Sequence, residues 1–218
     1  MNWGQELVNL YEKNSDRIGI IEYRGKMPYV LLPPFHTTVT AQIEVTIDEK
    51  GNFLNAFIVE AEDKLTIIPV TEKSGSRTAG KEPHPLCDNL RYLAGDYPNY
   101  CEDDGACYRL YIEQLKEWCE SELCHKKVRA VYLYLVKETL IKDLVKVKVL
   151  KLNENGKLDI KETIQGIPQT KAFVRFVVRS TDSDIDECWR DRMLQECYIE
   201  YNRSKVQKRE LCYLSGNI

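Results

Sequence analysis

The sequence predicts an α+β fold in which an antiparallel sheet, formed by the first 70 residues and by residues 172–178, has helices packed on one side. Two patterns carry this prediction. Apolar and polar residues alternate through residues 38–48 (TVTAQIEVTID), as they do in a half-buried strand. Through residues 104–123 the apolar residues recur at helical spacing instead. Hydrophobic residues make up 43% of the 218, which is enough for a packed core.

The strands are expected mainly in the first third of the chain. They are short strands at 18–23 and 29–32, a hairpin of 38–48 and 53–60 closed by a turn at 49–52, and a third strand at 65–70. An antiparallel meander is their natural assembly.

The helices are expected at 3–13, at 86–93 with Gly95 as a C-cap, at 104–123, at 126–136 and at 184–201. Residues 126–136 also contain β-branched residues that leave a strand possible. Residues 140–152 are ambiguous, because VKVKVLKL alternates like a strand. No run of about 18 apolar residues is present, so no transmembrane segment is expected.

Two regions follow from this pattern: residues 1–95 hold the sheet and a basic loop, and residues 96–218 are mainly helical with additional strands. The loop is TEKSGSRTAGKEPHP, residues 71–85, which has no large apolar side chain apart from its prolines. It is therefore expected to be an exposed connection, carrying Lys73, Arg77 and Lys81.

Charge is segregated along the chain, although the net charge is only -3. Residues 96–122 hold eight acids and two bases, whereas residues 126–151 hold eight bases and two acids. Two interpretations remain open: two solvated faces that attract each other, or a basic segment that lies along a phosphate backbone.

No catalytic motif is found. The spacing of Gly75 to Lys81 approaches a phosphate-binding loop, but Glu82 stands where the metal-binding Ser or Thr should be. No catalytic residue and no cofactor are therefore predicted. A metal-dependent nuclease stays open as an alternative because of two acidic clusters: Glu102, Asp103 and Asp104, and Asp182, Asp184 and Asp186.

The eight cysteines include no CxxC pair. Cys119, Cys124 and His125 form a local group, but a structural zinc site needs four converging ligands. No bound metal is predicted. The N-terminus lacks the pattern of a secretory signal, so we expect reduced thiols and a cytoplasmic protein.

The order of the motifs resembles one known family. A turn in IDEKGNF is followed by Ile68-Pro69-Val70, by the basic loop with Ser76-Arg77-Thr78-Ala79-Gly80, and by LCDNLRYLAG at 86–95. This order is similar to the N-terminal part of the large subunit of the type I-C CRISPR surveillance complex, Cascade. The segment 211–217 (LCYLSGN) is similar to a further family motif, with conservative departures. Family members are longer, so we expect the chain to be one compact N-terminal domain of a longer protein.

The resemblance implies a non-enzymatic subunit that recognises the protospacer-adjacent motif on double-stranded DNA and aids duplex opening in antiviral defence. Its partners would be the guide RNA ribonucleoprotein with the other Cascade subunits, and a recruited helicase-nuclease; no membrane is implied. A purely structural platform that binds RNA or protein is the remaining alternative.

A protein that recognises the protospacer-adjacent motif needs hydrogen-bond donors for base edges and for phosphates. Arg77 suits guanine or phosphate, and Asn89 either reaches a base or caps its own loop. The remaining DNA-binding candidates in the loop are Lys73, Ser74, Gly75, Ser76, Thr78 and Lys81, and those in the basic segment are Lys126, Lys127 and Arg129.

Overall fold

The computed structural model describes residues 3–77, 81–181 and 184–205. Its helices and sheets confirm the α+β prediction. No helix in these ranges is both long and apolar enough to cross a membrane.

The described strands form four small sheets. Their bounds are β1 Ile21–Arg24, β2 Met27–Val30, β3 His36–Thr40, β4 Ile43–Asp48, β5 Phe53–Ile58, β6 Leu65–Pro69, β7 Thr163–Ile164, β8 Ile167–Pro168 and β9 Val174–Arg179. Three pairs are antiparallel hairpins or ladders (β1–β2, β3–β6 and β7–β8), and the fourth sheet has the order β5-β4-β9.

The described helices and turns of 3-10 helix follow the same chain order. Their bounds are α1 Trp3–Lys13, η1 Ser15–Arg17, α2 Glu72–Gly75, α3 Leu90–Leu93, α4 Tyr97–Tyr100, α5 Ala106–Glu120, α6 Lys126–Leu135, α7 Leu140–Lys146, η2 Gln169–Lys171 and α8 Arg192–Lys205. The predicted helices at 3–13, 104–123 and 126–136 are therefore confirmed.

The single strand predicted over residues 38–48 is two strands, β3 and β4. The chain bends at Gln42, whose side-chain amide donates to Thr40 O and whose amide oxygen accepts from Phe173 N. These bonds secure the bend, after which β4 pairs with β5 and β9 while β3 pairs with β6. The apolar alternation continues across the bend, so the sequence pattern gives no sign of it.

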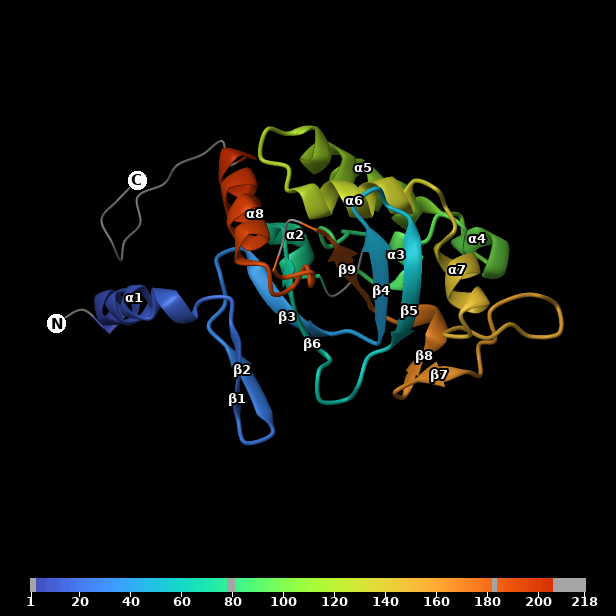
Figure 1. Cartoon of the computed structure of the whole chain (residues 1–218), viewed down its shortest axis with the longest axis horizontal. Coiled ribbons are helices and arrows are strands. Elements are labelled where there is room, and N and C mark those ends of the chain that lie inside the picture. The colour runs from blue at the N-terminus through green and yellow to red at the C-terminus, as the bar shows by residue number, and fades with distance from the viewer. Residues whose placement is uncertain (1–2, 78–80, 182–183, 206–218) are drawn as a thin grey trace.

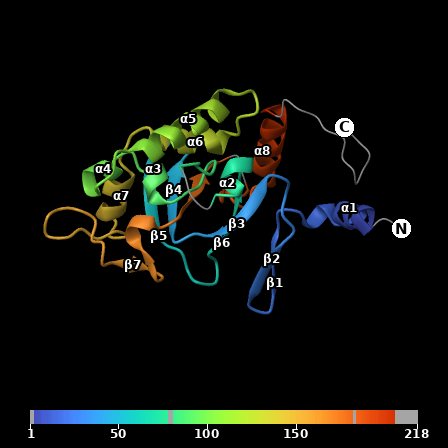
Figure 2. The ribbon, with the colours of Figure 1, turned by 180° about the vertical axis from the view of Figure 1, so that it is seen from behind.

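The predicted meander is also wrong in one pairing. The strand predicted near 172–178 joins the sheet as β9, but it runs parallel to β4, from Ile43 opposite Val174 to Asp48 opposite Arg179. Helices α5 and α6 cover one face of this sheet, and α6 contacts both β4 and β9. The same arrangement is visible from behind in Figure 2, and Figure 1 shows α1 lying apart from this body.

One hydrophobic core joins residues from both predicted regions. The helix-facing residues Ile43, Val45 and Ile47 of β4 are fully buried in it. Helix α8 packs on α5 through Trp118, which stacks on Tyr201 with ring centroids 5.6 Å apart. By contrast, no residue of α1 is buried.

Three helix boundaries differ from prediction. The helix predicted over 86–93 begins only at Leu90, because the Asn89 side chain accepts from Arg91 N and caps it. Gly95 is not a left-handed C-cap; its role is close approach, since a Cβ there would come within 2.8 Å of the Tyr108 ring. The helix predicted over 184–201 begins only at Arg192, because the Asp191 carboxylate accepts from Met193 N and Leu194 N and so caps α8.

Residues 140–152 contain a helix, α7, and no strand. Two features hold it. Asp96, which is buried, accepts from the backbone N–H groups of Ile141 and Lys142 at the first turn. At the other end Lys148 is left-handed (φ 64°), and Val149 N donates to Leu144 O while Lys148 N donates to Val145 O. This is a Schellman end with lysine where glycine is usual, so the sequence lacks the normal stop signal.

Replacing Lys148 with glycine is therefore expected to raise the free energy of unfolding by about 1 kcal/mol, because glycine adopts this conformation without strain. Urea denaturation of the purified chain measures the change. The matched control is Lys142→Gly, within the same helix, which should lower stability by about 1 kcal/mol. A loss of stability in Lys148→Gly would contradict the assignment of a strained helix end.

Candidate nucleic-acid interface

The loop after β6 is more ordered than its composition suggests. Thr71 and Ser74 form a reciprocal capping box around α2, each side chain accepting from the other residue's backbone N–H. Ser74 is buried as a result, and Pro83, His84 and Pro85 are buried as well. The prediction of a wholly exposed loop is wrong, because capping and proline packing take the place of large apolar side chains.

Arg77 lies at the centre of this loop. Its guanidinium donates to both oxygens of Asp88, at 2.9 and 3.1 Å, and to Glu82 O. It also lies over the Tyr92 ring, 4.8 Å from the centroid. Burial works against its charge, but the hydrogen bonds and the charge of Asp88 outweigh burial and raise the pKa of Arg77.

Asp88 has no solvent exposure and also accepts from His84 N and Asn89 N. A bidentate contact of Arg77 with guanine would require its fork to leave this buried carboxylate. Removing one partner of a buried pair costs about 3–5 kcal/mol. In the conformation described, Arg77 therefore positions the loop and its fork is already occupied.

The other loop candidates divide by exposure. The Asn89 side chain accepts from Arg91 N and caps α3. Of the two roles considered for Asn89, a base contact or a local cap, the structure shows the cap. Lys73, Gly75 and Ser76 are exposed, and Lys81 is exposed beside Asp104 at 3.4 Å. Thr78 lies outside the described residues.

The basic segment also divides. Lys127 has no solvent exposure. Its buried charge is compensated, since the ammonium group is 2.5 Å from Asp191 and also donates to Ile185 O. It has no surface to offer a phosphate, so its burial contradicts the prediction that Lys127 contacts DNA. Lys126 is exposed and lies 3.8 Å from Glu49, and Arg129 is exposed.

Lysines further along this segment are also available to a partner. Lys142 and Lys146, one turn apart on α7, are exposed, and Lys148 is exposed just beyond them. None of the three forms an ion pair with another described residue, whereas Lys137 donates to Gly51 O and Lys151 pairs with Glu162. Unpaired lysines on one short helix offer phosphate contacts without first breaking an internal bond.

Three carboxylates of the two acidic clusters are engaged in internal contacts. Asp103 pairs with Arg91 and accepts from Gly105 N, and Asp104 accepts from Ala106 N at the start of α5. Asp186 pairs with Arg179 at 2.7 Å, and Asp182 lies outside the described residues. Within the described ranges no three His, Cys, Asp or Glu side chains are grouped as metal ligands.

The predicted Cys–His group is a local thiol pair beside a helix cap. His125 caps α6 by accepting from Lys127 N. A hydrogen bond from Cys119 lowers the pKa of Cys124 to about 7, with help from Arg129 and against burial. The seven cysteines in the described ranges are free thiols, and Cys212 lies outside those ranges.

The polar face of the main sheet, on which Glu44 and Arg175 are buried together, was not predicted from the sequence. The only signal in the sequence is that charged residues occupy polar positions of two alternating strands, which is equally typical of a solvated face.

The fold and the surface define an α+β protein with available cations on α7, and the comparison with protein families assigns it to the CRISPR-associated proteins. Residues 7–218 match the family described as CRISPR-associated protein (Cas_Csd1), so the chain belongs to the Csd1 family. This agrees with the resemblance of residues 69–95 to the type I-C Cascade large subunit. No curated protein matches the sequence.

Proposed function

We propose that this chain is the DNA-binding part of the large subunit of a type I-C Cascade complex, where it recognises the protospacer-adjacent motif and aids duplex opening. The observation that carries the proposal is the match to the Csd1 family along nearly the whole chain. Sequence beyond the motif would be read by guide RNA pairing, as in other RNA-guided systems. The role is non-enzymatic and cytoplasmic, and cleavage falls to a recruited helicase-nuclease.

The geometry revises which residues carry the proposed contacts. Lys142 and Lys146, with Lys148, are the phosphate contacts of the basic segment. Lys73, Ser76 and Lys81 are exposed in the loop 71–85. They form a second group of contacts, to the DNA around the protospacer-adjacent motif. Arg77 and Lys127 do not contact DNA in this proposal. Through their buried ion pairs with Asp88 and Asp191 they hold the loop and helix α6 in place.

The double variant Lys142→Ala/Lys146→Ala is expected to weaken binding of plain duplex DNA by the isolated chain. The slope of log affinity against log salt is negative, and each lost phosphate contact lowers its magnitude by about 0.9, so the magnitude should fall by about 2. Fluorescence anisotropy with a labelled duplex between low and physiological salt measures both quantities.

The matched control is Lys26→Ala/Lys161→Ala, which removes the same charge from two exposed lysines on other elements. Equal loss of affinity in both double variants would mean that net charge alone governs binding. Binding that does not weaken with salt would refute a phosphate contact on α7.

A further inference from the structure

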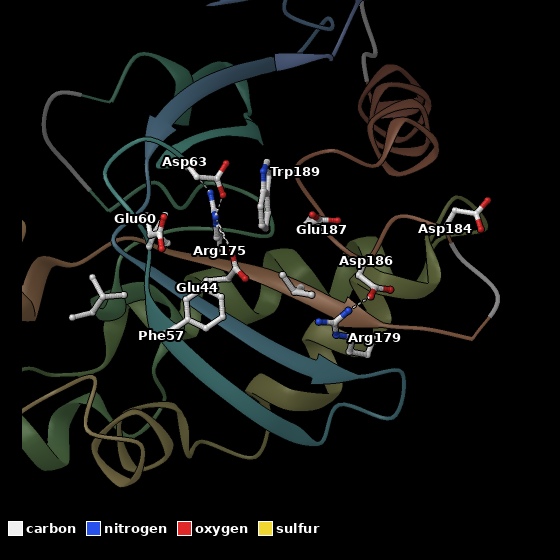
Figure 3. Close-up of a pocket in the computed structure, with 13 residues that line it drawn as sticks. Glu44, Phe57, Glu60, Asp63, Arg175, Arg179, Asp184, Asp186, Glu187 and Trp189 are labelled. Atoms are coloured by element: carbon white, nitrogen blue, oxygen red, sulfur yellow. Dashed lines mark hydrogen bonds and ion pairs between the residues drawn. The ribbon is translucent and has the colours of Figure 1, made fainter. Parts of the chain in front are cut away.

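The face of the β5-β4-β9 sheet opposite α6 carries a cavity of about 650 Å³. Figure 3 shows side chains of β4, β5 and β9, together with Asp63 and the segment 184–189, around it. Residues alternate along β4, so Glu44 points to this face while Ile43 and Val45 point to the core.

The cavity wall is strongly acidic. Six carboxylates line it, against the two guanidinium groups of Arg175 and Arg179; the six are Glu44, Glu60, Asp63, Asp184, Asp186 and Glu187. Arg175 pairs with Glu44 and Asp63, and Arg179 pairs with Asp186. Arg190, beside the lining residues, pairs with Asp63 and Glu187. Glu60 and Asp184 have no ion pair with any described residue, so the wall keeps negative charge that is not compensated internally.

Glu44 adds an acceptor to this wall, beside the guanidinium of its partner Arg175. The Glu44 side chain is only 10% exposed, and both hydrogen bonds from Arg175 go to one oxygen, Oε2. The other oxygen, Oε1, accepts no hydrogen bond from the described residues. Burial raises the pKa of Glu44, Arg175 opposes that rise, and Asp63 and Glu187 add to it. Arg175 neutralises Glu44 through Oε2, and Oε1 is left as an acceptor for a further donor, which is strongest when it carries positive charge.

Apolar groups beside the charges favour a side chain over a small ion. Phe57 of the edge strand β5, which is paired opposite Glu44, lines the cavity and is 46% exposed. Trp189 forms another wall and already carries the Arg175 guanidinium 3.8 Å from its ring centroid. Such a surface covers the methylene groups of a long basic side chain while carboxylates meet its head.

We propose that this cavity binds the guanidinium group of an arginine on an extended segment of a protein partner. The carboxylates would repel a phosphate backbone, so the surface is distinct from the lysines of α7. It lies at the edge strand β5, where a partner's main chain also finds unpaired hydrogen-bonding groups. The inference goes beyond the proposed DNA binding and does not depend on it.

The test uses the 218-residue chain and a blocked peptide, acetyl-Thr-Val-Arg-Val-Thr-amide, with the shift of the Trp189 indole N–H in NMR spectra as the readout. Saturable binding is expected. Replacing the peptide's arginine with neutral citrulline should weaken it about tenfold, since the charged hydrogen bonds are lost. Glu60→Gln/Asp184→Asn should weaken it about fivefold, since both carboxylates are exposed and lack internal partners.

The control Glu113→Gln/Glu154→Gln removes the same charge from exposed positions on other elements and should leave binding unchanged. Equal affinity for the citrulline peptide, or equal loss in both double variants, would overturn the proposal. It would also be overturned if magnesium chloride alone, or duplex DNA, saturated the same resonance and displaced the peptide.

Discussion

Replacing Arg77 with alanine is expected to lower the free energy of unfolding by about 3 kcal/mol, because it leaves a buried carboxylate without its counter-charge. Asp88 has no exposure, and Arg77 supplies two of its hydrogen bonds. We expect the lower end of the range for a broken buried pair, since His84 N and Asn89 N still donate to Asp88. Urea denaturation monitored by circular dichroism measures the loss.

A double-mutant cycle separates this ion pair from simple loss of side-chain packing. Asp88→Asn removes the charge that Arg77 neutralises, so Arg77→Ala should cost at least about 1 kcal/mol less in that background. Arg77→Lys keeps the charge but loses the two-pronged geometry, and should fall between wild type and alanine. If Arg77→Ala folds with undiminished stability, Arg77 is free to act on DNA directly and the positioning role is wrong.

Lys127→Met is expected to cost about 3–5 kcal/mol, since methionine fills the space of the lysine stem but leaves Asp191 without its cation. Lys127 is fully buried, Asp191 is 7% exposed, and the two groups lie 2.5 Å apart. Asp191 also caps α8, so the unpaired charge lies where α6 and α8 are joined. Thermal and urea unfolding of the variant provide the measurement.

The neighbouring residue provides a close control. Lys126→Met changes the same residue type one position earlier, where the side chain is 45% exposed and its partner Glu49 is also exposed, so the cost should stay below about 0.5 kcal/mol. Adding Asp191→Asn to Lys127→Met should recover part of the stability, because asparagine retains the cap without the charge. Similar costs at positions 126 and 127 would show that the buried pair contributes nothing specific.

Patterns confined to one element could be predicted from the sequence. The stripe on α5 indicated a helix because Tyr111, Leu115 and Trp118 lie on one buried face. The alternation in β4 indicated a strand, and Ile43, Val45 and Ile47 all enter the core. The strand is not half-buried as predicted, because Glu44 and Thr46 on its polar face are buried as well. The block at 86–95 indicated the family that the comparison then showed.

Partners far apart in sequence could not be predicted. Whether a cation is solvated or buried depends on its acidic partner. Lys127 pairs with Asp191, 64 residues away, and Arg175 pairs with Glu44, 131 residues away. Composition assigns all such cations to the surface, which is why Lys127 was expected on DNA. The ambiguity over residues 140–152, where VKVKVLKL alternates like a strand, has a local cause: Lys148 ends α7 in a left-handed conformation that glycine usually signals.

The most direct measurement of the DNA-binding role is selection of duplexes by the assembled Cascade complex from a library in which the bases beside a matched target are randomised. The proposal predicts that bound duplexes are enriched for particular bases at those positions, and that the enrichment is lost when this subunit is omitted. Lys142→Ala/Lys146→Ala should weaken binding of all flanking sequences alike while the enrichment persists, because phosphate contacts carry no sequence information. Unchanged enrichment in a complex that lacks the subunit would contradict the account.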